Sequence, residues 1–298
     1  MNAYDTNGIA VESVYDIEGT ELTDAYDVEG RSLSRSVDYD NYTISNYCTV
    51  SLTPTQGFDI YNGIIFQFLA SGSVSNKMAT VNASNSSIIS NNVVCVSDHG
   101  DSASFSDEKY SDNDDFPLLY VTSDTYPKVY INRVTTTTSE LIKTLYFPIE
   151  NAGYMPALAY DKANNIAYMI GYSEDNYQTD DGGNNKTVIT KWDLSELTQN
   201  QDGSYTPAFI SSTERPFIYV MQGIQWHDGM IWVASGATNT RGYVYALNPV
   251  NGNLLYTIDT NTTTELEGIA FLPDGNMVFG LQGGAYKKVT FESEAIVK

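Results

Sequence analysis

Residues 222–233, QGIQWHDGMIWV, decide the fold, because two short apolar runs flank the pair Asp228-Gly229. The same pattern returns in EGIAFLPDGNMVF (267–279) and, far upstream, in QGFDIYNGIIF (56–66). Each copy begins with Gln-Gly or Glu-Gly and contains an Asn-Gly or Asp-Gly pair, which favours the positive φ angles of tight hairpin turns. Hairpins that recur at the spacing of a propeller blade indicate a radial repeat protein.

Five such units can be counted along the chain. Three of them contain the hairpins quoted above, and the other two span residues 101–147 and 155–194. The last unit lacks an outer strand, whereas residues 42–50 form a strand without a partner. Pairing the two would close the ring and remove exposed sheet edges. We therefore predict an all-β fold with few helices: a five-bladed β-propeller over residues 41–298, closed by its N-terminal strand. A β-sandwich with similar turn spacing is the alternative.

Residues 1–40 contain a different repeat. The pattern Tyr-Asp-x-x-Gly occurs three times at steps of eleven residues, at 4–8, 15–19 and 26–30. A unit of eleven residues cannot bury a core by itself. Carboxylates outnumber the two arginines of this region by ten to two. The sequence therefore predicts an acidic repeat arm that serves as a tether or docking segment.

The net charge of −22 excludes two classes of partner. Nucleic acids and anionic membrane surfaces both require lysine and arginine, which are scarce in this chain. The first residues lack the basic start and apolar run of a signal peptide, and no segment is apolar enough for membrane insertion. Cys48 and Cys95 lie in predicted strands and are interpreted as two buried free thiols, with a disulfide between them as the alternative.

The hairpin at 56–66, the segments at 104–106 and 115–120, and the Gln-Gly and Glu-Gly pairs resemble propeller proteins of gut bacteria and their phages. The overall plan is similar to the five-bladed platform of tail receptor-binding proteins from phages that infect Gram-positive bacteria. The Tyr-Asp-x-x-Gly arm resembles the N-terminal arms of prophage tail and baseplate-associated proteins. The resemblance implies a non-enzymatic virion component of an oligomeric phage tail, extracellular after lysis. It would bind other virion proteins through the arm and a host cell-surface glycan.

Alignment of the five units predicts a polar ring where the inner strands meet the propeller axis. One column of this alignment, with His99 at its rim, contains Gln56, Asp101, Met155, Gln222 and Glu267. The next column contains Asp59, Ser104, Leu158, Gln225 and Ala270. The preferred interpretation of the first column is a hydrated plug that ties the blades together. The functional alternative is a site that binds a small polar ligand or a cation.

A glycan-processing enzyme is the second functional hypothesis, because a glycosidase needs an acid and a second carboxylate. Asp101 and Glu267, with Asp59 as a third carboxylate, are the candidates. Motifs of zinc enzymes and serine hydrolases are absent from the sequence, and His227 is expected on the side opposite His99.

Two acidic insertions, at 109–115 and 173–186, interrupt the second and third units. Their carboxylates offer oxygen ligands for Ca²⁺, but the spacing does not match an EF-hand, and solvated loops are the preferred interpretation. No other cofactor is expected. Tyr110, Tyr172 and Tyr177, in or beside these insertions, are candidates for stacking on sugar rings, with plain surface loops as the alternative.

Overall fold

The computed structural model describes residues 33–53, 55–71, 74–123 and 127–297. The chain forms two units: Ser45–Lys288, and a smaller one that consists of Met1–Ile44 and Val289–Lys298. The three Tyr-Asp-x-x-Gly repeats lie outside the described residues. In the smaller unit, Tyr39 packs edge-on against Phe291, with 4.9 Å between the ring centroids. The candidate sites all lie in Ser45–Lys288.

The regular elements of the described residues are almost all β-strands, as predicted, with one short α-helix, α1 (Ile149–Ala152), and one 3-10 turn, η1 (Asp181–Gly183). One four-stranded sheet has the order β2 (Phe58–Tyr61), β3 (Ile64–Ser71), β4 (Val74–Asn82), β5 (Ser87–Val94). A second has the order β14 (Met221–His227), β15 (Met230–Ser235), β16 (Tyr243–Leu247), β17 (Leu254–Asp259). A third has the order β1 (Leu33–Thr49), β20 (Ala285–Val297), β19 (Met277–Leu281), β18 (Leu266–Phe271). The remaining eight strands form one sheet, in the order β10 (Tyr154–Asp161), β11 (Ile166–Tyr172), β12 (Lys186–Gln199), β13 (Tyr205–Pro216), β9 (Ser139–Tyr146), β8 (Lys128–Val134), β7 (Leu119–Thr122), β6 (Ala103–Phe105).

The predicted hairpins are present. Asn62-Gly63 joins β2 to β3, and Asp228-Gly229 joins β14 to β15, with all four φ angles between 48° and 73°. The strand registers leave only these two residues in each turn. Positive φ at both turn positions matches the right-handed twist of the flanking strands, which explains the choice of Asn-Gly and Asp-Gly.

The eight-stranded sheet consists of two groups of four antiparallel strands, β6–β9 and β10–β13. A single parallel pair, Tyr205 with Leu145, joins them. Strand β13 was not predicted from the sequence. Strand β1 takes the fourth place in the sheet of β18–β20, and the backbone N–H of Val50 donates to the carbonyl of Gly284 (2.9 Å). Because β1 begins at Leu33, the predicted boundary at residue 40 falls inside a strand.

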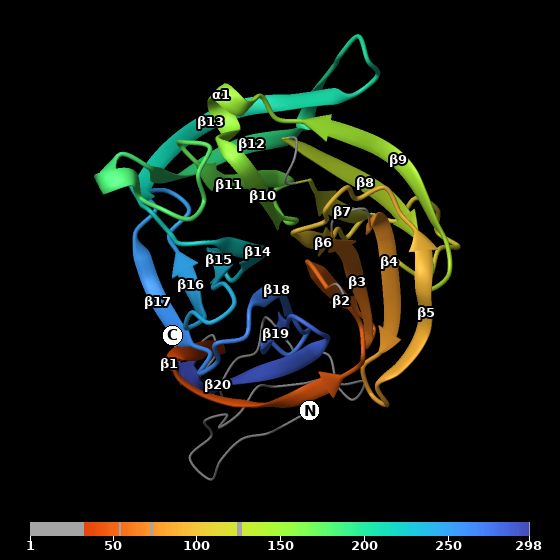
Figure 1. Cartoon of the computed structure of the whole chain (residues 1–298), viewed down its shortest axis with the longest axis vertical. Helices are drawn as coiled ribbons and strands as arrows, with labels where there is room; N and C mark the ends of the chain where they lie inside the picture. The colour runs from red at the N-terminus through yellow and green to blue at the C-terminus, as the bar shows by residue number, and fades with distance from the viewer. Residues whose placement is uncertain (1–32, 54, 72–73, 124–126, 298) are drawn as a thin grey trace. The chain divides into compact units, whose positions relative to one another are not determined.

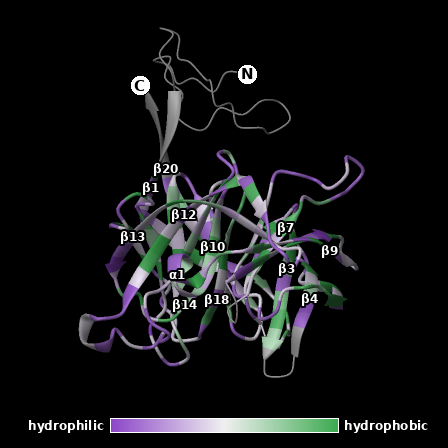
Figure 2. Ribbon diagram, turned by 90° about the horizontal axis from the view of Figure 1, so that it is seen from above, coloured by the Kyte–Doolittle hydropathy of each residue, from purple (hydrophilic) through white to green (hydrophobic). Residues whose placement is uncertain are grey.

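The sheets have a propeller-like arrangement rather than that of a sandwich (Figure 1). The first strands of successive groups, β2, β6, β10, β14 and β18, each contact the next, and β18 contacts β2 again. These strands surround one axis. Hydrophobic residues lie mainly on the strands and hydrophilic residues mainly on the connections (Figure 2). The loops at the two ends of the axis are therefore the surfaces available for function.

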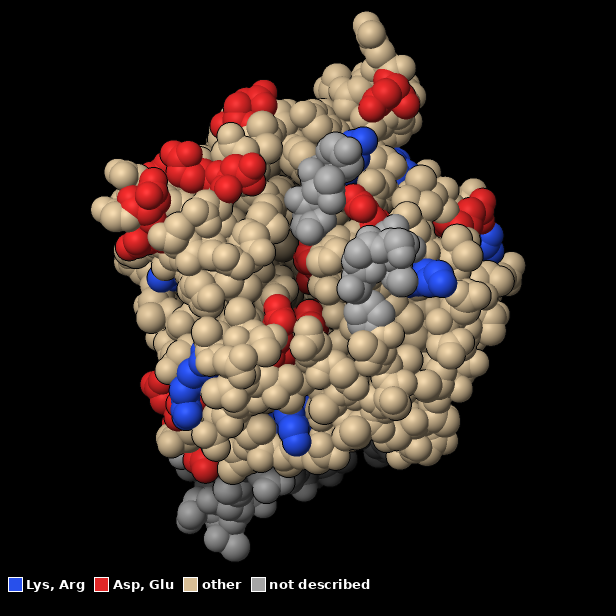
Figure 3. All heavy atoms as spheres, viewed as in Figure 1, with Lys and Arg blue, Asp and Glu red and all other residues tan. Residues whose placement is uncertain are grey.

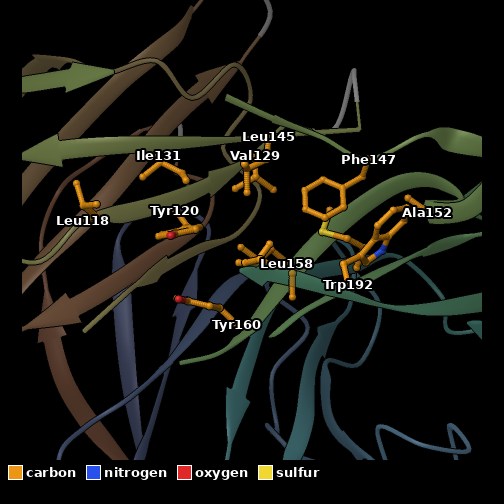
Figure 4. Close-up of a cluster of buried hydrophobic side chains, with 13 residues drawn as sticks. Leu118, Tyr120, Val129, Ile131, Leu145, Phe147, Ala152, Leu158, Tyr160 and Trp192 are labelled. Atoms are coloured by element: carbon orange, nitrogen blue, oxygen red, sulfur yellow. The ribbon is translucent and has the colours of Figure 1, made fainter. Parts of the chain in front are cut away.

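Hydrophobic clusters fill the spaces between neighbouring groups of strands. Between the two halves of the eight-stranded sheet, Tyr120 stacks on Tyr160 at 4.8 Å, and Phe147 packs edge-on against Trp192 at 5.2 Å (Figure 4). Aromatic pairs of this kind are stabilising beyond the area that they bury. Both cysteines are buried and free, as preferred from the sequence.

Candidate functional site

The glycines of the Gln-Gly and Glu-Gly pairs mark the points where inner strands approach most closely. A Cβ atom on Gly57 would lie 2.5 Å from the carbonyl oxygen of Asp101. A Cβ atom on Gly223 would lie 2.4 Å from the Cα atom of Gly268. Only glycine leaves room for backbones to meet in this way. Side chains alternate across a strand, so the residue before each glycine is free to face the axis.

These residues line a cavity of about 230 Å³ at one end of the axis, which we call the axial cavity. It contains all six predicted side chains, namely Gln56, His99, Asp101, Met155, Gln222 and Glu267. The structure thus brings the first column of the alignment together. Further side chains on its wall, which the alignment did not include, are Tyr172, Tyr177, Gln178, Glu265 and Gln282. Acidic atoms are visible in the hollow at the centre of the face shown in Figure 3.

Glu265 organises one side of the axial cavity. Its carboxylate accepts hydrogen bonds from Gln222 Nε2 (2.9 Å), Thr238 Oγ1 (2.9 Å) and Gln282 Nε2 (3.2 Å). Because a charged acceptor forms stronger hydrogen bonds than a neutral one, these contacts fix both amides. On another side of the cavity, Gln56 Nε2 donates to the carbonyl of Ala70 (3.3 Å).

His99 and Asp101 form a close pair, with 2.6 Å between Nδ1 and Oδ1. The histidine side chain is one-third exposed, whereas the aspartate side chain is more enclosed. A carboxylate in this position orients the imidazole ring and sets its tautomer. The pair can therefore hold the imidazole ring in a fixed orientation at the wall of the cavity.

Glu267 is the most unusual group of the axial cavity. It is only 3% exposed, and it lies in the wall of the cavity. Burial, helped by the negative charges of Glu265 and Asp101, raises the pKa of Glu267 to about 9. The group is therefore a neutral acid at pH 7. It offers an O–H donor and a carbonyl acceptor side by side.

The insertion at 173–186 also contributes to the axial cavity, whereas the insertion at 109–115 does not. In the insertion at 173–186, the buried side chain of Asn185 fixes the loop conformation. Its Nδ2 donates to the carbonyls of Asn176 and Thr179, and its Oδ1 accepts from the N–H of Glu174. Tyr177 and Gln178 of this loop line the cavity.

The insertion at 109–115 folds back onto the outside of its own sheet. Asp114 forms a two-pronged ion pair with Arg133, whose guanidinium lies 5.0 Å from the ring centroid of Tyr110. Tyr110 contacts this arginine but remains 54% exposed, as expected for a surface loop.

The layer below the axial cavity ties the inner strands together. Ser102 Oγ on the approach to β6 donates to the carbonyls of Ile224 (2.9 Å) and Leu158 (3.3 Å), on β14 and β10. Ser104 Oγ donates to Gln225 Oε1 (3.3 Å). These buried bonds close the axis. A layer below the first column thus contributes to tying the blades together, through Ser104 and Gln225 of the second column and through Ser102, which lies outside both columns.

Asp59 does not join the axial carboxylates, which corrects one part of the enzyme hypothesis. Its carboxylate accepts from the backbone N–H groups of Phe105 (2.7 Å) and Ile60 (2.8 Å), and it lines a cavity at the opposite end of the axis. Residues three apart on a strand are separated by about 10 Å along it. Asp101 and Glu267 face one end of the axis and Asp59 faces the other.

A second cavity of about 480 Å³, which we call the opposite cavity, lies at that other end. Its wall includes Asp59, Tyr61, Trp226, His227 and Phe271. His99 and His227 thus lie at different ends, as the sequence predicts.

The described residues contain no group of three or more His, Cys, Asp or Glu side chains arranged to hold a metal ion, which applies to both acidic insertions. None of the helices in the described part of the chain is long and apolar enough to cross a membrane.

Comparisons with known proteins bear on the fold alone. No family model and no curated protein sequence matches the chain. The structure is similar to that of a glutaminyl cyclase from Myxococcus xanthus, with 14% identity, a TM-score of 0.50, and coverage of 88% of this chain and 97% of the other. Weaker likenesses are to the computationally designed protein Ika8, with 10% identity, a TM-score of 0.38, and coverage of 83% and 100%, and to a nidogen–laminin complex, with 8% identity, a TM-score of 0.42, and coverage of 76% and 72%.

Proposed function

We propose that this chain is a five-bladed β-propeller that binds a small polar ligand in its axial cavity without transforming it. Two observations support the blade count. The inner strands of five groups form a closed ring of contacts, and among the described residues a single parallel strand pair joins the halves of the eight-stranded sheet. Each half then counts as one blade, and β1 is the outer strand of the last.

The observation that carries the binding proposal is the position of Glu267, a buried carboxyl group in the wall of the axial cavity. A buried polar group needs a hydrogen-bond partner, and a ligand in the cavity can provide one. A ligand with one acceptor and one adjacent donor, such as an amide or a vicinal diol, would satisfy it. Among the described residues that line the cavity there is no Lys or Arg, which disfavours anions. The volume lies below the usual range for drug-sized ligands, roughly 300–1,000 Å³, and fits a ligand of only a few heavy atoms.

Ligand-observed NMR and thermal melting with a panel of small amides, polyols and amino sugars test this proposal. A ligand should raise the melting temperature, because it binds only the folded state. Glu267→Gln keeps one donor and one acceptor and should retain binding within about threefold. Glu267→Leu should lose it by at least tenfold, the difference expected for about 1.4 kcal/mol. Equal affinity of the two variants would contradict the assignment of Glu267.

We extend the proposal to the biological role of the chain. It would be a receptor-binding component of a bacteriophage tail and would attach to other virion proteins through residues 1–40. Its support is the resemblance of the hairpins and of the Tyr-Asp-x-x-Gly repeats to phage proteins. Antibody labelling of virions in electron micrographs is the test, and virions that never carry label would end this part of the proposal.

Deletion of residues 1–32 should leave the melting temperature unchanged, because Ser45–Lys288 contains its own ring of sheets. The same deletion should abolish incorporation into virions. A shortened chain that melts several degrees lower would show that the arm is part of the folded core.

An acid–base enzyme is the second candidate, since a carboxyl group with a pKa of about 9 near Asp101 is suited to donate a proton. The assay should include host polysaccharides and glutaminyl peptides, because the structural neighbour is named a glutaminyl cyclase. Glu267→Gln cannot transfer a proton and should abolish turnover while retaining binding. Turnover by the native chain that this variant lacks would replace the binding proposal with the enzymatic one.

A further inference from the structure

The opposite cavity has the composition of a ligand site, although the axial proposal makes no use of it. Aromatic rings from four different sheet groups surround it, and they are Tyr61, Tyr160, Trp226 and Phe271. Its volume of about 480 Å³ lies within the range common for small-molecule sites. Hydrogen bonds of Ser102 and Gln225 close the axis between this cavity and the axial one.

The aromatic rings of the opposite cavity are held in place by other rings. Trp226 lies parallel to Tyr168, with 5.0 Å between centroids and 6° between planes. Phe271 lies parallel to His227, with 3.9 Å between centroids. Tyr61 packs against Phe105 at 5.4 Å. A ligand that stacks on such fixed rings loses little affinity to the ordering of side chains.

The polar groups of this cavity favour a neutral ligand with hydroxyl groups. Asp59 and Asp161 are buried in its wall, and Asp107 lies at its rim, 3.9 Å from Lys162 Nζ. Lys162 is the single basic side chain on the described wall, and burial lowers the pKa of His227 to about 4, so the imidazole is neutral at pH 7. The excess of carboxylates in the wall disfavours a negatively charged ligand. A positively charged ligand is also disfavoured, because Lys162 already pairs with the Asp107 carboxylate at the rim.

We propose that the opposite cavity binds one uncharged sugar unit of a carbohydrate. The C–H face of the pyranose ring lies against Trp226 or Phe271, and its hydroxyl groups exchange hydrogen bonds with Asp107 and Lys162. Sugars combine an apolar face with a ring of donors and acceptors, which matches this wall. The site is independent of the ligand proposed for the axial cavity.

Tryptophan fluorescence reports on this cavity directly. Of the three tryptophans, Trp192 and Trp232 are at most 1% exposed, whereas Trp226 is partly exposed on the cavity wall. Acrylamide quenching of the full chain is measured while the methyl glycosides of glucose, galactose, mannose and N-acetylglucosamine are titrated. At least one glycoside should reduce the quenching constant by twofold or more, with saturation. Trp226→Phe should remove the quenchable signal.

Variants distinguish this site from the rest of the surface. Asp107→Ala changes an exposed side chain and should weaken the glycoside by at least fivefold at an unchanged melting temperature. Phe271→Leu should weaken it similarly. Glu267→Leu, in the axial cavity, should leave glycoside affinity unchanged, so that failure of the axial proposal does not affect this test.

The proposal is overturned if no glycoside protects Trp226, or if Asp107→Ala and Phe271→Leu both retain native affinity. Protection by tetramethylammonium chloride without protection by any glycoside would instead assign the cavity to a cation. Loss of glycoside binding in Glu267→Leu would show that the two cavities are not independent and would also overturn it.

Discussion

Gly223→Ala should reduce the free energy of unfolding by about 3 kcal/mol or more, the upper range for overpacking of a core. The added Cβ atom would lie 2.4 Å from the Cα atom of Gly268 and 2.9 Å from the N atom of Ile269. Both contacts are with backbone of the neighbouring inner strand, so no side chain can rotate away. The two strands must separate, and the separation would also disturb the wall of the axial cavity. Urea unfolding followed by circular dichroism measures the change.

Gly229→Ala is the matched control for this prediction. Gly229 lies in the turn of the same hairpin at φ 72°, and an added Cβ atom would meet nothing within 4 Å. Its replacement should cost only the strain of a left-handed conformation, about 1 kcal/mol. If the two variants lose similar stability, crowding at the axis is not the reason for the Gln-Gly and Glu-Gly pairs.

Glu267→Gln should stabilise the protein at pH 7 by about 3 kcal/mol, the linkage expected from its raised pKa. The pKa of Glu267 is about 9 in the folded state, against 4.5 for a glutamate side chain in water. Below pH 4.5 both states hold the proton, and there is no penalty. Between pH 4.5 and pH 9 only the unfolded chain releases it, so native stability falls as the pH rises. Above pH 9 both states are ionised and the loss is complete.

The free energies of unfolding of Glu267→Gln and the native chain at pH 4 and pH 7 test this prediction. The contributions of all other titrating groups cancel when the two proteins are compared at the same pH. The variant and the native chain should be nearly equal at pH 4 and should differ at pH 7. Glu265→Gln serves as the control. It removes the charge from an acceptor of three hydrogen bonds and should destabilise the protein at pH 7. A variant at Glu267 that is less stable than the native chain at pH 7 would show that its carboxyl group is ionised there.

The hairpins could be predicted from the sequence because their turns are local. Asn62-Gly63 and Asp228-Gly229 need only their own backbone conformations to specify a two-residue turn. The alignment of these hairpins also placed Gln56, Gln222 and Glu267 at one level of the axis. Strand β13 was missed for a different reason. Most of its residues are partly or fully exposed, so it lacks the apolar alternation that identifies a half-buried strand.

The composition of the sites was harder to predict than their position. Glu265 and Gln282 reach the axial cavity from loops, and no alignment of strands includes them. Asp59 was grouped with Asp101 and Glu267 because all three are carboxylates near the starts of inner strands. This grouping did not take into account the rise along a strand. Asp59 lies three residues after Gln56, the position aligned with Asp101 and Glu267, and therefore faces the other end of the axis.

The pairing of β1 with β20 has a consequence for how the protein is made. Lys287 Nζ donates to Asn46 Oδ1 (3.2 Å), a contact between residues 241 positions apart. Because synthesis proceeds from the N-terminus, this contact can form only after residue 287 has been synthesised. Until then the backbone groups of the strand around Asn46 have no partner strand. The sheets between the two positions pair mostly strands that are neighbours in the sequence, so they can form earlier. Completion of the last sheet is therefore a late, non-local event in folding, and such contacts are slow to form. The nascent chain is most exposed to misassociation with a second copy during this interval, because the β1 strand of one copy is a ready partner for the β20 strand of another.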